Sequence, residues 1–308
     1  MLRSVVPGPE DVIREQAIIH VQALAARSGG LVRREQLEAV ALQGETLRFI
    51  APQQGIWTPK GFSAGLSILT TAVRPNERPP YEDAIGPDNY PRYNWRGADP
   101  LHHDNQSLRR AMEQRKPLIW FVGIIPGLFR PFCPVWLADE EPEQRQFVVA
   151  LDQSMLDGWR ADLMLAGPFD TARRYAEVLV RQRLHQRPFR DRVLLAYERQ
   201  CALCRLRHPR LLDAAHIKRD SEGGEPIVSN GLAMCVLHHR AFDADVLTVL
   251  PSYRIEVNGK VLAEQDGPTL QYALQSLHGE PIQLPKHRIE HPDRELLEER
   301  YERFRAAV

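Results

Sequence analysis

The chain has 308 residues, 43% of them hydrophobic and 26% charged, and its formal net charge at pH 7 is zero. These are the proportions of a globular protein, and they exclude a membrane protein because no apolar run is long enough to span a bilayer. The N-terminus lacks an apolar secretory segment, so we expect a cytoplasmic protein of two or three domains with no membrane partner.

Residues 1–71 are predicted to form a helical, winged-helix-like segment. Apolar residues recur at helical spacing from about residue 10, Gly29 and Gly30 end this helix, and REQLEAVAL begins a second one. TLRFIA is expected as a short strand, and IWTPKGF as an extended piece that follows a turn at Gly55. Two helices followed by a strand pair serve either DNA binding or plain domain packing.

A long loop at residues 74–100 combines prolines with aromatic and arginine side chains. The prolines preclude a regular helix, so we expect an exposed, structured loop. Aromatic rings interleaved with arginine can stack on a nucleobase and contact its phosphate, although the same rings could instead pin the loop to the protein surface. The candidate DNA-binding residues are Tyr90, Arg92, Tyr93, Trp95, Arg96 and, just beyond the loop, His102.

The segment after this loop indicates a compact α+β or barrel-like domain over residues 72–170. HHDNQSLRRAMEQRK is predicted to be a helix with Asp104 as its N-cap. The continuous apolar run in PLIWFVGIIPG predicts a fully buried strand, and FCPVWLA and QFVVALD predict two more. Cys133, within an apolar run, is expected to be a packing residue.

The third predicted domain, residues 171–308, begins with a basic helical segment. Thirteen Lys and Arg face five Asp and Glu between Arg173 and Asp220. Such a block can hold a polyanion although the whole chain is neutral; the alternative is a solvated helix face. Further on, we expect a hairpin around Asn258 and Gly259 and a polar helix after Asp293. The candidate contacts to the DNA backbone are Arg181, Arg183, Arg187 and Lys218.

Three of the four cysteines fall in the stretch from Cys201 to Asp243. Cys201 and Cys204 are followed, roughly thirty residues later, by Cys235 and His238 at the same spacing. In a reducing compartment this grouping favours a metal over disulfides, and two such pairs suit a tetrahedral structural Zn²⁺. The alternative is that the cysteines are packing residues and the histidine is only their neighbour.

The same stretch contains residues suited to phosphodiester hydrolysis. LLDAAHI predicts a strand that ends at His216, and His239 and Asp243 are four residues apart. On a helix these two would share a face and could hold one divalent cation. His216 would act as the general base that takes a proton from water, and Asn230 would fix the intervening loop.

The order CxxC, AAHI, NGL, CxxHH and FD over residues 190–250 resembles the HNH, or ββα-metal, nuclease family. The resemblance implies that His216 is the base, that Asn230 supports the site and that His239 binds the catalytic Mg²⁺ or Mn²⁺, with Asp243 as a further ligand.

The chain departs from that pattern at one position. Many members have a metal ligand directly before the base, where this chain has Ala215. Either Asp213 reaches the metal, or water and phosphate complete its coordination.

The string YRYNWRGADPLHHDNQSLRRAMEQRKPLIWFVGI is similar to the N-terminal specificity module of bacterial HNH restriction enzymes that attack modified DNA. In those enzymes the module is often SRA-like, a PUA-type β-barrel that flips a modified base into a pocket. The expected fold class is therefore α+β: a winged-helix-like segment, an SRA/PUA-like barrel and a zinc-stapled ββα-metal HNH domain.

The expected function is metal-dependent cleavage of modified double-stranded DNA in restriction, by a homodimer where both strands are cut. The alternative is a zinc-stapled DNA-binding protein with an inactive nuclease core, which the missing ligand at Ala215 favours. A homing nuclease is disfavoured because repeated small DNA-binding modules are lacking.

Overall fold

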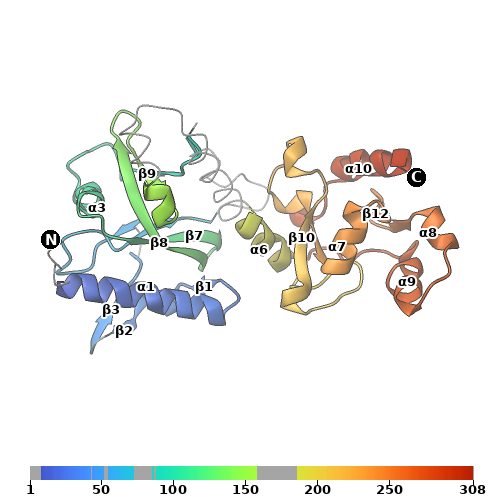
Figure 1. Cartoon of the computed structure of the whole chain (residues 1–308), viewed down its shortest axis with the longest axis horizontal. Helices are drawn as coiled ribbons and strands as arrows, with labels where there is room; N and C mark the ends of the chain where they lie inside the picture. Colours follow the sequence, from blue (N-terminus) through green and yellow to red (C-terminus); the bar gives the residue numbers. More distant parts are fainter. Residues whose placement is uncertain are drawn as a thin grey trace. The chain divides into compact units, whose positions relative to one another are not determined.

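The computed structural model describes residues 8–42, 44–51, 55–72, 85–86, 88–157 and 186–307. Of these, the residues up to 157 form one compact unit, here called the N-terminal unit, and those from 186 form the C-terminal unit (Figure 1). Within the described ranges, no helix combines the length and the apolar composition needed to cross a membrane.

The N-terminal unit is built on a seven-stranded sheet with the strand order β4-β5-β7-β8-β9-β6, and β1 pairs with β8. All strand pairs are antiparallel except β5 and β7, which are parallel. The strands are β1 (Val32–Arg33), β4 (Ile56–Trp57), β5 (Ser67–Thr70), β6 (Arg92–Asn94), β7 (Leu118–Ile125), β8 (Leu128–Glu141) and β9 (Gln146–Ala150), and the main helices are α1 (Pro9–Arg27) and α3 (His103–Glu113).

The central strand β7 is buried on both faces, as its apolar run predicts. Trp120 and Val122 belong to the core that contains the apolar side of α3, whereas Ile119 and Phe121 belong to the core that contains the apolar side of α1. Side chains alternate across a strand, so one run of apolar residues contributes to two cores. The two helices accordingly cover opposite faces of the sheet (Figure 1).

The first 71 residues differ from the winged-helix-like prediction. The second helix is a single turn, α2 (Glu35–Glu38), and it is followed by the hairpin of β2 (Val40–Leu42) and β3 (Glu45–Leu47). Strands β4 and β5 pair within the same sheet as β7. The boundary expected between residues 71 and 72 therefore does not separate two cores, because α1 finds its apolar partners on β7 and β8.

The segment expected to be an exposed aromatic loop is partly built into the sheet. Strand β6 pairs with β9, and Tyr90, only 1% exposed, donates a hydrogen bond from its hydroxyl to the carbonyl of Met155. Arg92 is 5% exposed, and its guanidinium lies 2.8 Å from a carboxylate oxygen of Asp88 and of Glu141. These side chains stabilise the N-terminal unit in place of facing solvent.

The sheet curls so that its two ends approach each other. The hydroxyl of Tyr93 on β6 donates to the carbonyl of Gly55, just before β4, at 2.7 Å. Burial raises the pKa of Tyr93, so its hydroxyl keeps the proton that it donates. Among the described residues no strand ladder joins β6 to β4; the structure shows a curled sheet and does not show the expected SRA/PUA-like barrel.

Replacing Arg92 with alanine should lower the free energy of unfolding of the N-terminal unit by about 3 kcal/mol, because it breaks a buried ion pair. This value is the lower end of the usual range because Glu141 is 30% exposed. All five tryptophans precede residue 186, so urea unfolding followed by tryptophan fluorescence reports this unit. The exposed Lys60 provides the control, Lys60→Ala.

The effect of Arg92→Ala should depend on pH. The hydrogen bond from Arg92 lowers the pKa of Glu141 below its ordinary 4.5, so the carboxylate contributes stability above that pH. This contribution is lost as the pH falls through the lowered pKa. The difference between wild type and variant should therefore shrink in acid; a difference that stays constant would show that the ion pair is not its source.

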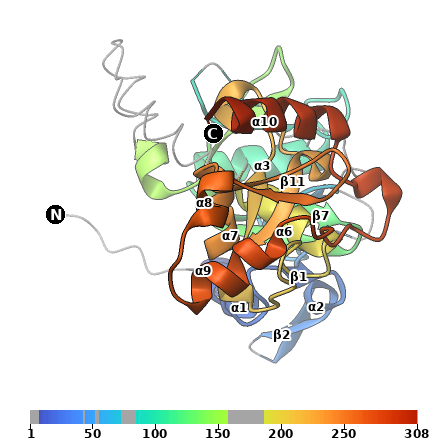
Figure 2. The ribbon, with the colours of Figure 1, turned by 90° about the vertical axis from the view of Figure 1, so that its right-hand side faces the viewer.

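Among the described residues of the C-terminal unit, α6, the hairpin of β10 and β11, and α10 all contribute to one core. Figure 2 shows the helices of this unit, with α10 across the top and α8 and α9 along one side. Its elements are α6 (Arg187–Ala196), β10 (Leu212–His216), β11 (Gly231–Cys235), α7 (Val236–Asp243), β12 (Leu247–Val249), β13 (Ile255–Val257), α8 (Gly259–Ala263), α9 (Pro268–Ala273) and α10 (Arg294–Ala307), with 3-10 turns at Pro209–Leu211, Asp220–Glu222, Val228–Asn230, Gln275–Leu277 and Arg288–Glu290.

The hairpin expected around Asn258 and Gly259 is wrong, whereas the polar C-terminal helix is confirmed as α10. Strand β13 pairs with the preceding β12. Asn258 is instead the N-cap of α8, and its side-chain oxygen accepts a hydrogen bond from the amide of Lys260 at 2.9 Å. Asparagine favours both tight turns and helix N-caps, and here the residues that follow it form a helix.

Candidate functional site

Most of the residues predicted for catalysis and metal binding lie on one hairpin and the helix that follows it. Strands β10 and β11 are antiparallel, with Leu212 opposite Cys235 and His216 opposite Gly231. Helix α7 starts directly after Cys235. The hairpin therefore has a cysteine at one end, near the start of α7, and His216 at its other end.

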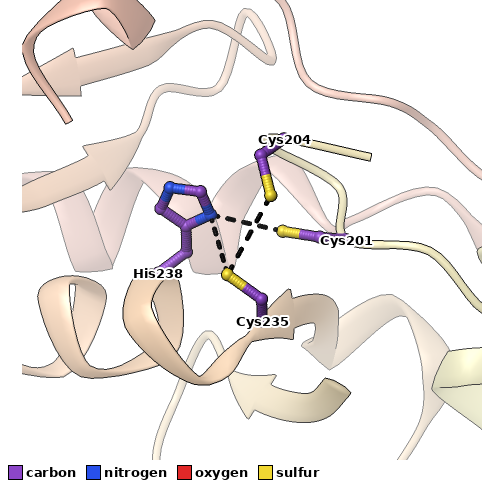
Figure 3. A group of neighbouring side chains, drawn as sticks. All are labelled: Cys201, Cys204, Cys235 and His238. Atoms are coloured by element: carbon purple, nitrogen blue, oxygen red, sulfur yellow. Dashed lines mark hydrogen bonds between the residues drawn. The ribbon is translucent and has the colours of Figure 1, made fainter. Parts of the chain in front are cut away.

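Four side chains converge at the cysteine end (Figure 3). Cys201 and Cys204 lie on a tight turn, in which the amide of Arg205 donates to the carbonyl of Cys201 at 2.9 Å. The Nδ1 atom of His238 lies 3.4 Å from Cys201 Sγ and 3.2 Å from Cys235 Sγ, and the Sγ atoms of Cys204 and Cys235 are 3.9 Å apart. The ligand atoms of all four residues lie within 4.8 Å of one another.

The orientation of the His238 ring fits metal binding. Its Nε2 lies 2.8 Å from the carbonyl oxygen of Ala273, and a carbonyl can only accept, so Nε2 carries the proton. Nδ1 then presents its lone pair to the cysteines, which is the tautomer that an imidazole ligand needs. Three sulfurs and one imidazole are a donor set suited to zinc.

His239, the next residue on α7, lies between two carboxylates. Its Nδ1 is 3.4 Å from Asp213 Oδ2 on β10, and its Nε2 is 3.5 Å from Asp243 Oδ2, one turn further along α7. The hydrogen bond to Asp213 raises the pKa of His239. Burial alone would raise the pKa of Asp213, but the hydrogen bonds with His239 and with the amide of Ala214, together with the charges of His239 and Arg190, outweigh it and the pKa is lowered. Imidazole and carboxylate are suitable ligands for a divalent cation.

At the other end of the hairpin, Asn230 fixes the loop that follows His216. Asn230 is fully buried, and its side-chain oxygen accepts from the amide of Lys218 at 2.9 Å. Its side-chain nitrogen donates to the carbonyls of Lys218 and Glu225, at 3.1 and 2.8 Å. The amide thus ties the start of the loop to its end, next to the histidine predicted to be the base.

Two residues of α6 that sequence reasoning missed also contact the predicted site. The ring of Phe189 stacks on His216 with the ring centroids 4.0 Å apart and the planes at 18°. Arg190 Nε lies 3.5 Å from Asp213 Oδ1. No local pattern marks either residue, because both contacts depend on how α6 packs against the hairpin.

Three further predicted DNA-binding residues lie between β6 and α3 of the N-terminal unit. Arg96 pairs with Asp104 at 2.5 Å. The N-cap of α3 is His102, whose Nδ1 accepts from the amide of Asp104, so the expectation that Asp104 is the cap is wrong. Trp95 is half-buried, with Arg109 5.7 Å from its ring.

The basic candidates are placed only in part. Lys218 pairs with Glu299 of α10 at 3.0 Å, and Arg187 is the first residue of α6. Arg181 and Arg183 lie outside the described residues.

Residues 201–249 match the model of the HNH endonuclease family. A comparison with curated proteins finds no match. Similar solved structures include the "Modification dependent TagI restriction endonuclease", 16% identical over 82% of this chain and 85% of that one with a TM-score of 0.31. Another is the "Type IV phosphorothioation-dependent restriction endonuclease ScoMcrA", 13% identical over 80% of this chain and 59% of that one with a TM-score of 0.22.

At TM-scores this low, neither likeness supports a statement about fold or substrate. The family match covers both strands of the hairpin, α7, and the cluster of Cys201, Cys204, Cys235 and His238. The C-terminal unit of this chain therefore carries a region that matches the HNH endonucleases, a family of hydrolases that cleave DNA.

Proposed function

We propose that the protein is a metal-dependent DNA endonuclease in which His216 is the general base. The observation that carries the proposal is the contact of His239 with both Asp213 and Asp243, on the same hairpin and helix as His216. A divalent cation such as Mg²⁺ or Mn²⁺, bound by His239 and Asp243, would supply positive charge for the phosphate and for the leaving 3′ oxygen.

The chain's own residues supply the rest of the reaction. A neutral His216 imidazole takes a proton from a water molecule as that water's oxygen attacks phosphorus, and the P–O3′ bond breaks. The products are a 5′ phosphate and a 3′ oxygen that takes up a proton from solvent. Asn230 holds the backbone at Lys218, two residues after His216, so that the base returns to one position after each turnover.

The proposal extends to modified DNA as the substrate, in a restriction role. It is supported by the presence of an N-terminal unit whose cores are distinct from the nuclease core. Because Tyr90, Arg92 and Tyr93 are engaged inside that unit, the predicted reader residues that remain accessible are Trp95, Arg96 and His102. A homodimer would bring two such nuclease sites to the two strands.

A panel of otherwise identical plasmids tests the proposal: unmodified, methylcytosine, hydroxymethylcytosine and phosphorothioate DNA, each with Mg²⁺, Mn²⁺ or EDTA. We expect cleavage only with a divalent ion and faster cleavage of one modified form, and supercoiled plasmid separates nicking from double-strand cutting. Trp95→Ala should lower the ratio of the rates on modified and unmodified DNA, and Lys60→Ala should not.

Two outcomes would contradict the proposal. Binding of DNA without cleavage under every metal condition would favour the alternative, a zinc-stapled DNA-binding protein with an inactive core. Equal rates on all four plasmids would remove the modified-DNA part and leave the nuclease.

A further inference from the structure

Helix α6 places two consecutive side chains at the proposed site, one against His216 and the other against the carboxylate that contacts His239. It lies before residue 201, outside the part of the chain that matches the family model. Phe189 contacts His216, and Arg190 contacts the carboxylate that contacts His239. A helix that reaches both groups can set their geometry although it contributes no group to the reaction.

The contact between α6 and His216 is close and nearly parallel. Phe189 is 1% exposed, and its ring centroid is 4.0 Å from that of His216. The residue opposite His216 in the hairpin is Gly231, where an added Cβ would lie 3.0 Å from Phe189 Cζ and 2.4 Å from Val193 Cγ2. The helix therefore packs directly on the His216–Gly231 pair, and Phe189 covers one face of the imidazole.

Arg190 is held against β10 by the backbone. Its Nη2 donates to the carbonyl of Leu212 at 2.7 Å and to that of Pro209 at 3.2 Å. With the guanidinium fixed in this way, its Nε lies beside Asp213 Oδ1, and Asp213 Oδ2 faces His239 Nδ1. The result is a chain of contacts from α6 through Asp213 to one nitrogen of His239.

Asp213 and Asp243 approach opposite nitrogens of the same ring. Among the described residues, the ligand atoms of Asp213, His239 and Asp243 do not form a group within 4.8 Å of one another. One ion cannot then take all three as ligands in this arrangement. A carboxylate on Nδ1 fixes the ring with Nε2 free to bind, which is a common way of orienting a histidine ligand.

We propose that α6 is the positioning element of the nuclease site. Phe189 fixes the ring plane of His216, and Arg190, through Asp213, holds His239 with Nε2 directed toward Asp243. Asp213 thus compensates for the ligand missing at Ala215 by orienting the His239 ring, and it does not itself bind the metal. This inference rests on the function proposed above.

The Phe189 contact is tested by Phe189→Met, which keeps most of the buried volume and removes the ring. Misplacing a catalytic group by about 1 Å lowers the rate about 100-fold, so we expect single-turnover cleavage to fall between about 10- and 100-fold. The affinity for DNA and the zinc content should not change. Phe304→Met, the same substitution at a buried position on α10, is the matched control and should keep the wild-type rate.

Combining Phe189→Met with His216→Ala separates positioning from a general loss of structure. If Phe189 acts through His216, the substitution has no further effect once His216 is absent. Three results would overturn this part of the proposal. Phe189→Met could cleave at the wild-type rate, or Phe304→Met could lose as much rate as Phe189→Met does. Phe189→Met could also cause the same loss of rate when His216 is already alanine.

The Arg190 contact is tested by Mn²⁺ affinity in the absence of DNA, measured by calorimetry on the full chain. Removing a nearby positive charge should strengthen cation binding if only charge matters, whereas loss of positioning should weaken it by about 10- to 100-fold. We expect weaker binding in Arg190→Gln and in Asp213→Asn. Arg240→Gln, which removes an exposed charge on α7, should bind Mn²⁺ as tightly as wild type or more tightly.

Asp243→Asn sets the scale for loss of a ligand. Asp213→Asn should retain measurable Mn²⁺ binding, whereas Asp243→Asn should not. Equal losses of affinity in these two variants would mean that Asp213 is itself a ligand. Unchanged or tighter Mn²⁺ binding in Arg190→Gln would overturn the positioning role of Arg190. A wild-type protein that binds Mn²⁺ but cuts no DNA would count against the proposed function, while the Mn²⁺ affinities would still decide the roles of Arg190 and Asp213.

Discussion

Replacing His216 with alanine is expected to slow DNA cleavage by about 10²- to 10⁴-fold, the contribution usual for a positioned general base. The methyl group that remains cannot accept a proton from the attacking water. Binding of DNA and of zinc should be retained, because the cysteine cluster lies at the other end of the hairpin. Single-turnover rates with Mg²⁺ and with Mn²⁺ measure the effect.

The matched control is His208→Ala, which removes an exposed histidine that precedes the turn at Pro209–Leu211. It should cut at the wild-type rate. Wild-type cleavage by His216→Ala would show that another group activates the water, and loss of DNA binding in that variant would show that His216 serves binding.

Removing zinc, or one of its ligands, is expected to unfold the C-terminal unit. Structural zinc contributes about 10–16 kcal/mol in zinc-finger peptides, which is as much as the whole stability of a typical domain. Cys235→Ser should therefore lose its far-UV circular dichroism in part and become sensitive to protease after residue 186. Tryptophan fluorescence should stay native-like, because all five tryptophans precede that residue.

Cys133→Ser is the control for the loss of a thiol. Cys133 lies on β8 of the N-terminal unit, and burial raises its pKa to about 12, so it remains a neutral thiol. Elemental analysis should find one zinc per chain both in this variant and in the wild type. A wild-type protein that contains no zinc, or a Cys235→Ser variant that folds normally, would refute the structural zinc site.

The parts of the site that the sequence predicts are those fixed by short spacings. Two residues between ligands place Cys201 with Cys204 on a turn, and a four-residue step places His239 with Asp243 on one face of α7. Phe189 and the carbonyl of Ala273 could not be predicted in this way. The first contact depends on the packing of a separate helix, and the second on a backbone atom that leaves no trace in residue identity.

The fold was predictable to a similar extent. A continuous apolar run predicted β7 because a strand buried on both faces has no polar side. The parallel pairing of β5 with β7 links segments about fifty residues apart, and periodicity carries no information about such partners. For the same reason Tyr90 and Arg92 were expected on a surface, although β9 and the neighbouring carboxylates enclose them.

The position of α6 also limits how this nuclease can be exchanged between proteins. A segment cut at Cys201, where the family match begins, would keep the cysteine cluster and both histidines. It would lose Phe189 and also Tyr197, whose buried hydroxyl donates to the carbonyl of Gly231 at 3.3 Å. A fusion protein that uses this nuclease domain would therefore have to begin before Arg187. The functional domain is thus longer at its N-terminal side than the segment that matches the family.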